Sequence, residues 1–308
     1  MKIAFLFAGQ GAQYVGMGKD LYEANELVKA MYDSIHLDFD VKDVCFNGPK
    51  EVLDDTRYTQ AAIFMHSMAC ASLLREYGIM PSAVAGLSLG EYSALCFANA
   101  FSLEDGAHIV GIRGQLMADA LPQGTTSMAA VLMLDENLIL EACQEVKHIG
   151  VCEIANYNCP GQIVITGDKE AVEQASKLCL EKGARKVIPL QVSGAFHSSL
   201  LEQASRRLET VLKGYQLQTP SIPVYHNVSG TPLEEDLVTI LGKQICHSVY
   251  FTQTINNMLK DGIDVFVEVG PGKTISGFVK KITKGKDVKI LHVEDQASLM
   301  ACIQALKG

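Results

Sequence analysis

The sequence predicts an α/β fold with a mainly parallel sheet and a smaller ferredoxin-like unit inserted into it. Short apolar runs, typical of strands covered on both faces, alternate with helix-like segments in the first and last thirds of the chain. The middle of the chain has a different rhythm, with its elements in the order β-α-β-β-α-β. At 308 residues, of which 48% are hydrophobic, the chain is long enough to bury a large core.

The first third predicts two strands separated by helices. Residues 2–8 are apolar after Lys2, as expected of a buried strand, and residues 82–86 form a second short apolar run. The tetrapeptide S-L-E-D at Ser102 has the spacing of a capping box and opens a helix from Leu103. The other helices expected in this part cover residues 19–33, 61–77 and 89–99.

The last third predicts three more strands, at residues 222–227, 265–269 and 289–293, with helices between them. Buried strands that alternate with helices favour a mainly parallel sheet.

The middle segment predicts a separate small domain. Its expected elements, in order, are a strand at 127–133, a helix at 136–147, strands at 151–156 and 162–166, a helix at 170–182 and a strand at 186–192. This order is that of the split ferredoxin-like unit. We therefore expect a small domain at 124–194 inserted into a large discontinuous domain, 1–123 and 195–308, with the active site in the cleft between them.

Composition argues against several classes of partner. The net charge of −9 would repel a phosphate backbone, so nucleic acid is not expected to bind. The apolar run after Met1 is broken at once by glycines, which is too short for a signal peptide or a membrane span. Nine scattered cysteines without a C-x-x-C pair favour a reducing compartment, and a cytoplasmic location is expected. Eight dispersed histidines give no metal-binding pattern.

The stretch V-A-G-L-S-L-G-E-Y-S-A, residues 84–94, places Ser88 in a G-x-S-x-G motif between a predicted strand and a predicted helix. In that context a serine is held on a sharp turn with its hydroxyl exposed, as a nucleophile requires. Gly86 and Gly90 are expected to be needed because a Cβ at either position would collide with the neighbouring strand or helix. An ordinary strand-to-helix turn is the alternative, and the flanking elements favour the nucleophile.

His197 is the best placed of the histidines to act as the base for Ser88. It precedes Ser199 and Glu202, whose spacing predicts a capping box, so the positive end of a helix would favour a neutral imidazole. A histidine that merely lies near a helix cap is the alternative, and the presence of Ser88 in the same chain weakens it. No acidic residue stands out as a third triad member, and a backbone carbonyl could orient the imidazole instead.

Arg113 is expected on the apolar face of the helix from Leu103, because it shares a stripe of i+3 and i+4 steps with Gly106, Val110 and Met117. A buried guanidinium must find an anion. That anion is either an internal Asp or Glu, or a substrate carboxylate bound through two parallel hydrogen bonds, and the pattern alone leaves both open.

Two glycine-rich stretches resemble nucleotide loops and fail as such. F-A-G-Q-G-A-Q, residues 7–13, lacks the third glycine of a dinucleotide fingerprint, because Tyr14 stands there. G-P-G-K-T, residues 270–274, lacks the first glycine of a phosphate loop, because residue 267 is valine. The first stretch could instead supply a backbone N–H to an oxyanion hole, with Leu89 supplying another.

Together these pieces resemble the malonyl-CoA:acyl carrier protein transacylase family, nearly from end to end. Seven motifs occur in the family's order: F-A-G-Q-G-A-Q, T-Q-A-A at Thr59, G-L-S-L-G-E-Y-S-A, I-R-G at Ile112, N-Y-N-C-P-G-Q at Asn156, S-G-A-F-H-S and V-E-V-G-P-G-K. The resemblance implies an α/β-hydrolase-like large domain, a ferredoxin-like small domain and catalysis between them.

The resemblance also implies a role for each matching residue. Ser88 is the expected nucleophile and His197 the expected base, which together form a Ser-His dyad, and Arg113 is the expected partner of the malonyl carboxylate. The remaining assignments are the amides of Gln10 and Leu89 as the oxyanion hole, Gln60 and Asn158 as residues that line the site, Phe196 as a ring that crowds a methyl branch, and a carbonyl near Ser248 to Tyr250 that orients His197. Leu87 departs from the family, many of whose members have histidine there.

The activity that the resemblance implies is malonyl transfer from malonyl-CoA to the phosphopantetheine thiol of acyl carrier protein in fatty acid biosynthesis. No cofactor or metal is called for, and a monomer is expected. The alternatives are a free-standing transferase of a polyketide pathway, a serine esterase or thioesterase of similar fold, and a non-catalytic scaffold. The carrier proteins of this family are acidic, so a local basic area including Lys280, Lys281, Lys284 and Lys286 is a candidate docking surface; an ordinary solvated charge run explains these lysines equally well.

Overall fold

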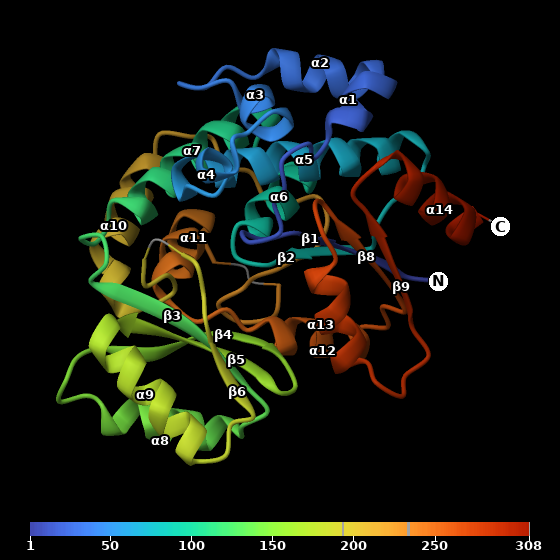
Figure 1. Ribbon diagram of the computed structural model, residues 1–308. Helices are drawn as coiled ribbons and strands as arrows, with labels where there is room; N and C mark the ends of the chain where they lie inside the picture. The colour runs from blue at the N-terminus through green and yellow to red at the C-terminus, as the bar shows by residue number, and fades with distance from the viewer. Residues whose placement is uncertain (193, 233–234, 308) are drawn as a thin grey trace.

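The computed structural model describes residues 1–192, 194–232 and 235–307. Within these residues the chain forms one five-stranded and one four-stranded sheet, which lie in two parts of the molecule (Figure 1). The expected α/β fold class, with a mainly parallel sheet and a separate small antiparallel sheet, is confirmed.

The large sheet is parallel throughout and has the strand order β7-β2-β1-β8-β9. Its strands are β1 (Ile3–Phe7), β2 (Ala83–Gly86), β7 (Val224–Tyr225), β8 (Val265–Val269) and β9 (Lys289–Val293). β1, β2 and β8 are buried along their whole length, which explains their continuous apolar sequence. Because all five strands run the same way, their carboxyl ends meet at one edge, and the loops after β1 and β2 lie side by side there.

Helices cover both faces of this sheet (Figure 1). The helices of this part of the chain are α1 (Lys19–Ala24), α2 (Glu26–Ser34), α3 (Val41–Phe46), α4 (Lys50–Leu53), α5 (Thr56–Glu76), α6 (Gly90–Phe97), α7 (Leu103–Ala118), α10 (Glu202–Leu212), α11 (Leu237–Cys246), α12 (Phe251–Lys260), α13 (Thr274–Ile282) and α14 (Gln296–Lys307), with a short 3-10 turn at Ser199–Leu201. α5 and α6 pack in the main core, where Phe97 contacts the rings of Phe5 and Phe7.

The small antiparallel sheet has the strand order β4-β5-β3-β6, and the chain order of its elements is the β-α-β-β-α-β expected from the sequence. Its elements are β3 (Thr126–Leu132), α8 (Glu136–Glu145), β4 (Cys152–Cys159), β5 (Gln162–Asp168), α9 (Lys169–Glu181) and β6 (Lys186–Pro189). Alternate residues of β3 face opposite ways: Ala129 and Val131 pack in the core with α8 and α9, whereas Met128 and Ala130 face the large part. The sheet therefore forms one wall of the cavity described below.

The two parts are joined by hydrogen bonds at the start of α12. Val249 donates its backbone N–H to Ala155 of β4 at 2.8 Å and accepts from the N–H of Tyr157 at 2.9 Å. The rings of Tyr157 and Tyr250 stack with centroids 5.0 Å apart. The exact domain boundaries at 123/124 and 194/195 stay predictions.

Several sequence expectations differ from the structure. The strand expected at 222–227 is only Val224–Tyr225, because Pro223 has no N–H for the sheet and a turn begins at Asn227. The single helix expected at 19–33 is two helices, because Asn25 adopts an extended conformation and its side-chain amide donates to the Leu21 carbonyl. The helix expected at 61–77 begins earlier, at Thr56, where Asp55 caps it by accepting from the Arg57 N–H. The strand expected at 186–192 ends at Pro189. The short helices α3 and α4 and the final helix α14 were not expected.

All nine cysteines lie within the described residues and carry free, buried thiols. Over the same residues, no helix is both long enough and apolar enough to cross a bilayer.

Candidate active site

Ser88 lies on a tight turn between β2 and α6, with a backbone φ of 53° that is rare for a residue with a side chain. The turn is possible only because its flanking residues are glycines. A Cβ on Gly86 would lie 1.9 Å from the carbonyl carbon of Gly90, and a Cβ on Gly90 would lie 2.1 Å from the backbone oxygen of Phe7. The expected collisions are confirmed, and the arrangement is the one that exposes a nucleophilic hydroxyl.

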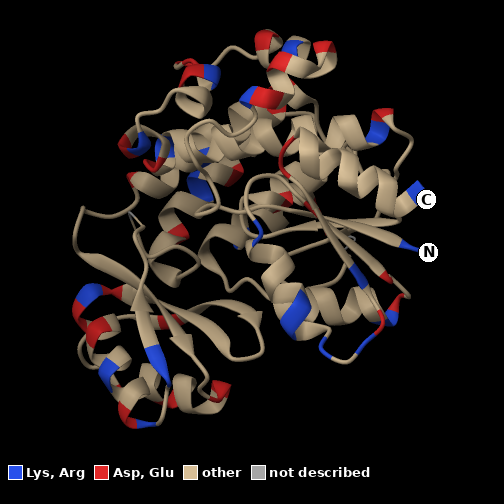
Figure 2. Cartoon of the chain, turned by 45° about the vertical axis from the view of Figure 1, so that its right-hand side comes forward, with Lys and Arg blue, Asp and Glu red and all other residues tan. Residues whose placement is uncertain are grey.

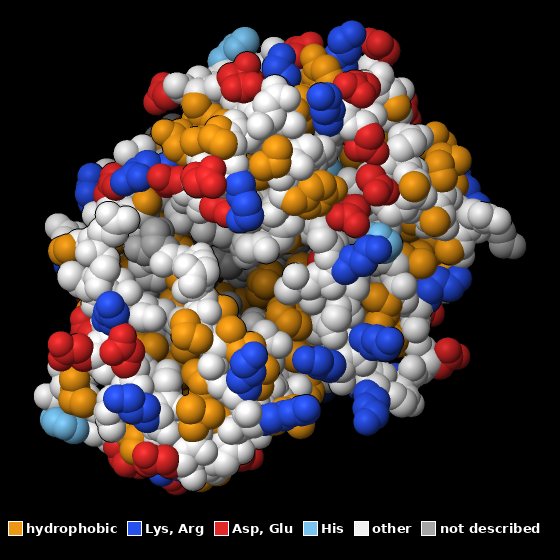
Figure 3. All heavy atoms as spheres, viewed as in Figure 1, with side chains coloured by type: hydrophobic (Ala, Val, Ile, Leu, Met, Phe, Trp, Pro, Cys, Tyr) orange, Lys and Arg blue, Asp and Glu red, His pale blue; other side chains and the backbone are white. Residues whose placement is uncertain are grey.

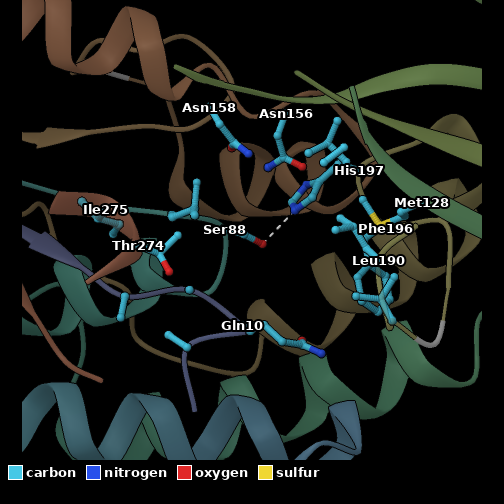
Figure 4. Close-up of a pocket in the computed structure, with 18 of the residues that line it drawn as sticks. Gln10, Ser88, Met128, Asn156, Asn158, Leu190, Phe196, His197, Thr274 and Ile275 are labelled. Carbon is cyan, nitrogen blue, oxygen red and sulfur yellow. Dashed lines mark hydrogen bonds between the residues drawn. The ribbon is translucent and has the colours of Figure 1, made fainter. Parts of the chain in front are cut away.

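His197 meets this hydroxyl across 109 positions of sequence. The Ser88 hydroxyl donates to Nε2 of His197 at 2.7 Å, as the dashed line in Figure 4 marks, and Nδ1–H of His197 donates to the carbonyl oxygen of Gln244 at 2.8 Å. A carbonyl can only accept, so the ring proton belongs on Nδ1 and the Nε2 lone pair is free to take the serine proton.

His197 is buried, and its pKa is lowered to about 4, first by desolvation and then by the charge of Arg113. The imidazole is therefore neutral near pH 7, as a general base requires. A neutral imidazole was also expected from the sequence, but was attributed to the positive end of a helix. Ser199 does not cap a helix; its hydroxyl donates to Glu153 at 2.7 Å, and α10 begins only at Glu202, after the 3-10 turn. Burial, rather than a helix end, accounts for the low pKa.

The carbonyl that orients His197 was expected near Ser248 to Tyr250, and that expectation is wrong. The partner is Gln244, in the last turn of α11. The His197 backbone N–H also donates to the carbonyl of Ile245 at 3.1 Å, so the segment that carries the imidazole is docked on the end of this helix. Carbonyls at the end of a helix have no partner within the helix, which leaves them free for this role.

Arg113 projects from α7 beneath the same serine and is only 1% exposed. Its guanidinium donates to the Ser88 hydroxyl at 3.1 Å, to Oε1 of Gln60 at 2.7 Å and to Oε1 of Gln244 at 2.9 Å, and it lies over the ring of Tyr92. Burial lowers its pKa. No carboxylate among the described residues lies within 4 Å of it. The internal ion pair that the sequence left open is therefore absent from this part of the chain.

The serine and the imidazole face a cavity of about 240 Å³ between the two sheets, and Figure 3 shows the molecule hollowed at this place. Figure 4 shows how the loop after β1, the tight turn at Ser88 between β2 and α6 (the elbow) and the small sheet contribute to it. The expected site residues Gln10, Gln60, Asn158 and Phe196 all line it. Its apolar wall comes mainly from Met117, Met128, Ala130, Val164, Leu190, Val192 and Phe278. The side-chain oxygen of Asn158 is buried and has no hydrogen-bond partner among the residues that the structure describes.

Two backbone amides beside the serine have no acceptor among the described residues. One is that of Gln10, which lines the cavity, and the other is that of Leu89, which like Arg113 is not among the lining residues. Leu89 directly follows the nucleophile at the start of α6, and Gln10 follows β1, the strand that pairs with β2. Unpaired N–H groups in these places are suited to stabilise a developing oxyanion.

The G-P-G-K-T loop contributes to the cavity and not to a phosphate site. Thr274 and Ile275, at the start of α13, line the cavity. The helix amides that could hold a phosphate already donate to Glu268, from Ile275 at 2.9 Å and from Ser276 at 2.7 Å. A search of the described residues finds no group of three or more metal-ligating side chains.

The comparisons with known proteins agree with this geometry. The family model for the acyl transferase domain matches residues 4–295. A "Malonyl CoA-acyl carrier protein transacylase" of Bacillus subtilis is 40% identical over 311 residues, covering 99% of this chain and 98% of the relative. This chain belongs to the malonyl-CoA:acyl carrier protein transacylase family.

Solved structures of this family superpose closely on the chain. The transacylase of Clostridium perfringens is 40% identical with a TM-score of 0.96, covering 100% of this chain and 98% of that one. That of Streptococcus pneumoniae is 44% identical with a TM-score of 0.94, covering 99% of this chain and 100% of that one. A further structure, described as a type II PKS acyl-carrier protein in complex with its malonyl-transacylase, is 35% identical with a TM-score of 0.95, covering 99% and 100%.

Leu87, which the sequence analysis singled out, lines the cavity beside Ser88 and has an aliphatic side chain that cannot transfer a proton. His197 makes the hydrogen bond to the Ser88 hydroxyl.

Sequence reasoning missed three residues that hold the site together: Gln244, Asn227 and Glu91. Gln244 acts partly through its backbone, which carries no residue-type signal. Asn227 and Glu91 lie outside the cavity, beneath the elbow. The one available signal was Glu91 itself, an acidic residue in an otherwise apolar helix start.

Proposed function

We propose that this protein transfers the malonyl group from malonyl-CoA to the phosphopantetheine thiol of an acyl carrier protein. One observation carries the proposal: a buried guanidinium without a carboxylate partner among the described residues lies 3.1 Å from a nucleophilic serine. A malonyl thioester supplies both an electrophile for the serine and an anion for the arginine. The names of the transacylase relatives support the same substrates.

In the first half-reaction, Ser88 attacks the thioester carbonyl carbon of malonyl-CoA. His197 takes the hydroxyl proton at Nε2, and the new O–C bond forms as the carbonyl oxygen becomes an oxyanion held by the amides of Gln10 and Leu89. The C–S bond then breaks, and coenzyme A leaves as a thiol with the proton that His197 returns. The product is a malonyl ester of Ser88.

In the second half-reaction, the carrier's pantetheine thiol gives its proton to His197 and attacks the ester. The Ser88 oxygen leaves and recovers the proton, so each turnover restores the enzyme. The two substrates use one site in turn, which predicts ping-pong kinetics. These steps require neither a metal ion nor a cofactor besides the two thioester-forming substrates.

Selectivity follows from the guanidinium in contact with Ser88 and from the ring beside the base. Arg113 favours acyl groups that end in a carboxylate. The ring of Phe196, beside the base, leaves little room for a methyl branch, so malonyl is preferred over methylmalonyl.

The experiment that tests the proposal is a brief incubation with malonyl-CoA followed by intact-mass measurement. We expect a gain of one malonyl group in the wild type and none in Ser88→Ala. A scaffold protein would show no adduct, and a hydrolase would release free malonate faster than it passes malonyl to pantetheine; either result would contradict the proposal.

We propose fatty acid synthesis as the setting, because the transacylases of Bacillus subtilis and Staphylococcus aureus are named for the acyl carrier protein alone. One structural relative is the transacylase of a type II PKS carrier. Offering the malonyl-enzyme equal amounts of both kinds of carrier separates the two settings: the expected result is faster transfer to the fatty acid carrier.

A monomeric state and a cytoplasmic location remain part of the proposal. Light scattering of the purified protein at micromolar concentration tests the first, and cell fractionation tests the second.

A further inference from the structure

The proposed mechanism makes no use of Glu91, a carboxylate in the first turn of α6 that is 0% exposed. Three donors surround it. Nδ1–H of His226 donates to Oε1 at 2.7 Å, and Oε2 accepts from the backbone N–H of Asn227 at 3.1 Å and from Nε2 of Gln244 at 2.9 Å. A buried anion is costly unless it is fully hydrogen-bonded, so this surrounding set of donors is built around the charge.

Two of these donors also hold the backbone of the nucleophile. Oδ1 of Asn227 accepts from the Ser88 N–H at 2.7 Å, and Nε2 of Gln244 donates to the Ser88 carbonyl at 2.8 Å. Both polar groups of the Ser88 backbone are thus fixed by side chains of residues that also donate to Glu91, Asn227 through its backbone N–H and Gln244 through its side-chain amide. A residue with the positive φ of Ser88 keeps that conformation only where its surroundings over-determine it.

Gln244 extends the same connection to the base and to the arginine. Its backbone carbonyl accepts from His197, and its side-chain Oε1 accepts from Arg113. The side-chain amide has only one useful orientation. If it were turned over, its NH2 would face the guanidinium and its oxygen would face both Glu91 and the Ser88 carbonyl. The carboxylate of Glu91 therefore helps to set the orientation in which the Gln244 side chain accepts from Arg113 and donates to the Ser88 carbonyl.

We propose that Glu91 is a positioning residue for the acylation of Ser88, acting through Asn227 and Gln244 without touching the substrate. Its carboxylate contacts His226, Asn227 and Gln244 and none of the residues proposed to touch the substrate, so we expect its main effect on the chemical step rather than on binding. The inference rests on the proposed function, because acylation by malonyl-CoA is the reaction in which it is measured.

The test compares wild type, Glu91→Gln and a control variant by rapid-quench mass spectrometry of the malonyl-enzyme. Glu91→Gln keeps the side-chain volume but replaces one of the two acceptor oxygens with a donor, so Asn227, Gln244 and His226 compete for a single oxygen. We expect the acylation rate constant to fall at least tenfold, with the half-saturating concentration of malonyl-CoA changed by less than threefold. The matched control is Asp168→Asn in the small sheet, whose carboxylate accepts from the Val151 N–H and which lies outside the cavity; its rate is expected within twofold of wild type.

A purely structural role would lower the melting temperature and leave the folded protein as fast as wild type. All rates are therefore measured at least about 15 °C below each variant's melting temperature. A folded Glu91→Gln protein that acylates within threefold of wild type would overturn the proposal.

The double variant Glu91→Gln with Gln244→Glu keeps the result decisive if the single variant does not fold. The double variant keeps one carboxylate between positions 91 and 244 and places it next to Arg113, so we expect it to fold. It cannot donate to the Ser88 carbonyl, so slow acylation is expected here too, and a wild-type rate would refute the positioning role. Failure of the wild type itself to acylate would count against the proposed function and not against this comparison.

Discussion

The guanidinium of Arg113 donates to the hydroxyl of Ser88 at 3.1 Å, which places the nucleophile and a buried positive charge in direct contact. A carboxylate on an acyl group bound to Ser88 would lie within reach of this charge, and a neutral acyl group would gain nothing from it. We propose this contact as the physical basis for selecting a malonyl group.

Replacing Arg113 by alanine is expected to lower the ratio of malonyl to acetyl acylation by on the order of 100-fold, because a charge-assisted pair in a desolvated site is worth several kcal/mol. Single-turnover acylation with malonyl-CoA and acetyl-CoA measures this ratio. Arg57→Ala is the control, since Arg57 pairs with Asp55 and Asp119 on the surface and should leave the ratio unchanged. An unchanged ratio in Arg113→Ala would remove its assigned role.

The pH dependence of acylation tests the environment of His197. The base must be neutral, so the rate falls as pH falls through its pKa, which burial and Arg113 lower to about 4. We expect nearly equal acylation rates at pH 7.5 and pH 5.5. With an ordinary histidine pKa near 6.5, the rate at pH 5.5 would be about tenfold lower, so half-maximal acylation near pH 6.5 would contradict the buried, neutral imidazole.

Two glycine-to-alanine variants test the close approach at the elbow. Gly90→Ala is expected to destabilise the protein by about 3 kcal/mol, because the new Cβ would lie 2.1 Å from the Phe7 oxygen, which is rigid backbone. Gly111→Ala in α7 meets no atom within 4 Å and is expected to stabilise the protein by roughly 0.5–1 kcal/mol. Denaturant melts of the two variants measure both values; equal effects would mean that the elbow is less crowded than described.

Stability at low pH tests the buried His66. Desolvation lowers the pKa of His66 to about 4, so as pH falls below 6.5 the unfolded chain takes up a proton before the folded one. The free energy of unfolding should therefore fall between pH 7 and pH 5, by about 2 kcal/mol from this group, and His197 acts in the same direction. In His66→Gln, this part of the pH dependence of the free energy of unfolding is expected to be lost. The control His148→Gln, at an exposed position, is expected to keep it. Equal slopes in wild type and His66→Gln would show that His66 titrates normally.

The lysines at the end of α13 and in the loop after it form an exposed basic surface, consisting of Lys280, Lys281, Lys284 and Lys286 (Figures 2 and 3). Within the described residues none of the four makes an ion pair. The same helix lines the cavity through Thr274, Ile275 and Phe278, so a carrier docked on this surface would lie close to the cavity.

Reversing two of these charges, in Lys280→Glu with Lys284→Glu, is expected to slow transfer from the malonyl-enzyme to an acidic carrier protein about tenfold at low salt, with a smaller effect at high salt. Transfer to free pantetheine, which carries no charge, should be unchanged. Lys177→Glu, on α9 of the small sheet, serves as the control. If the transfer rate fell equally with free pantetheine and with the carrier protein, or if the fall did not depend on salt, the four lysines would be an ordinary solvated charge run.

Local patterns were enough to predict most of the elements and the identity of the site's main residues. The expected strands at 265–269 and 289–293 have the bounds of β8 and β9. β8 is buried along its whole length, as an apolar run between turn residues predicts, whereas β9 is a partly buried edge strand. The β-α-β-β-α-β order was equally local. Ser88 was recognisable because its motif states a steric requirement at Gly86 and Gly90, and Arg113 because its place on an apolar stripe is a matter of helical period.

The residues that only the tertiary structure could supply act over long sequence separations. Gln244 reaches His197, Arg113 and Ser88 from 47, 131 and 156 positions away, and Glu91 reaches Asn227 from 136. The type of a residue gives no sign that its backbone carbonyl has a role. The carbonyl that orients His197 was therefore predicted at the wrong residues, near Ser248 to Tyr250 instead of Gln244. The absence of a carboxylate near Arg113 in the described chain was likewise undecidable in advance, because it depends on every element packed around α7.

The sequence by itself determined most of the strands and helices, the elbow and which side chains have suitable chemistry, because each depends on neighbours within a few residues. The tertiary structure decided which of these meet, since that depends on the strand order β7-β2-β1-β8-β9 and on the small sheet closing over its carboxyl edge. The low pKa of His197 and the buried charge of Glu91 belong to that second group, because desolvation exists only once distant segments have excluded water together.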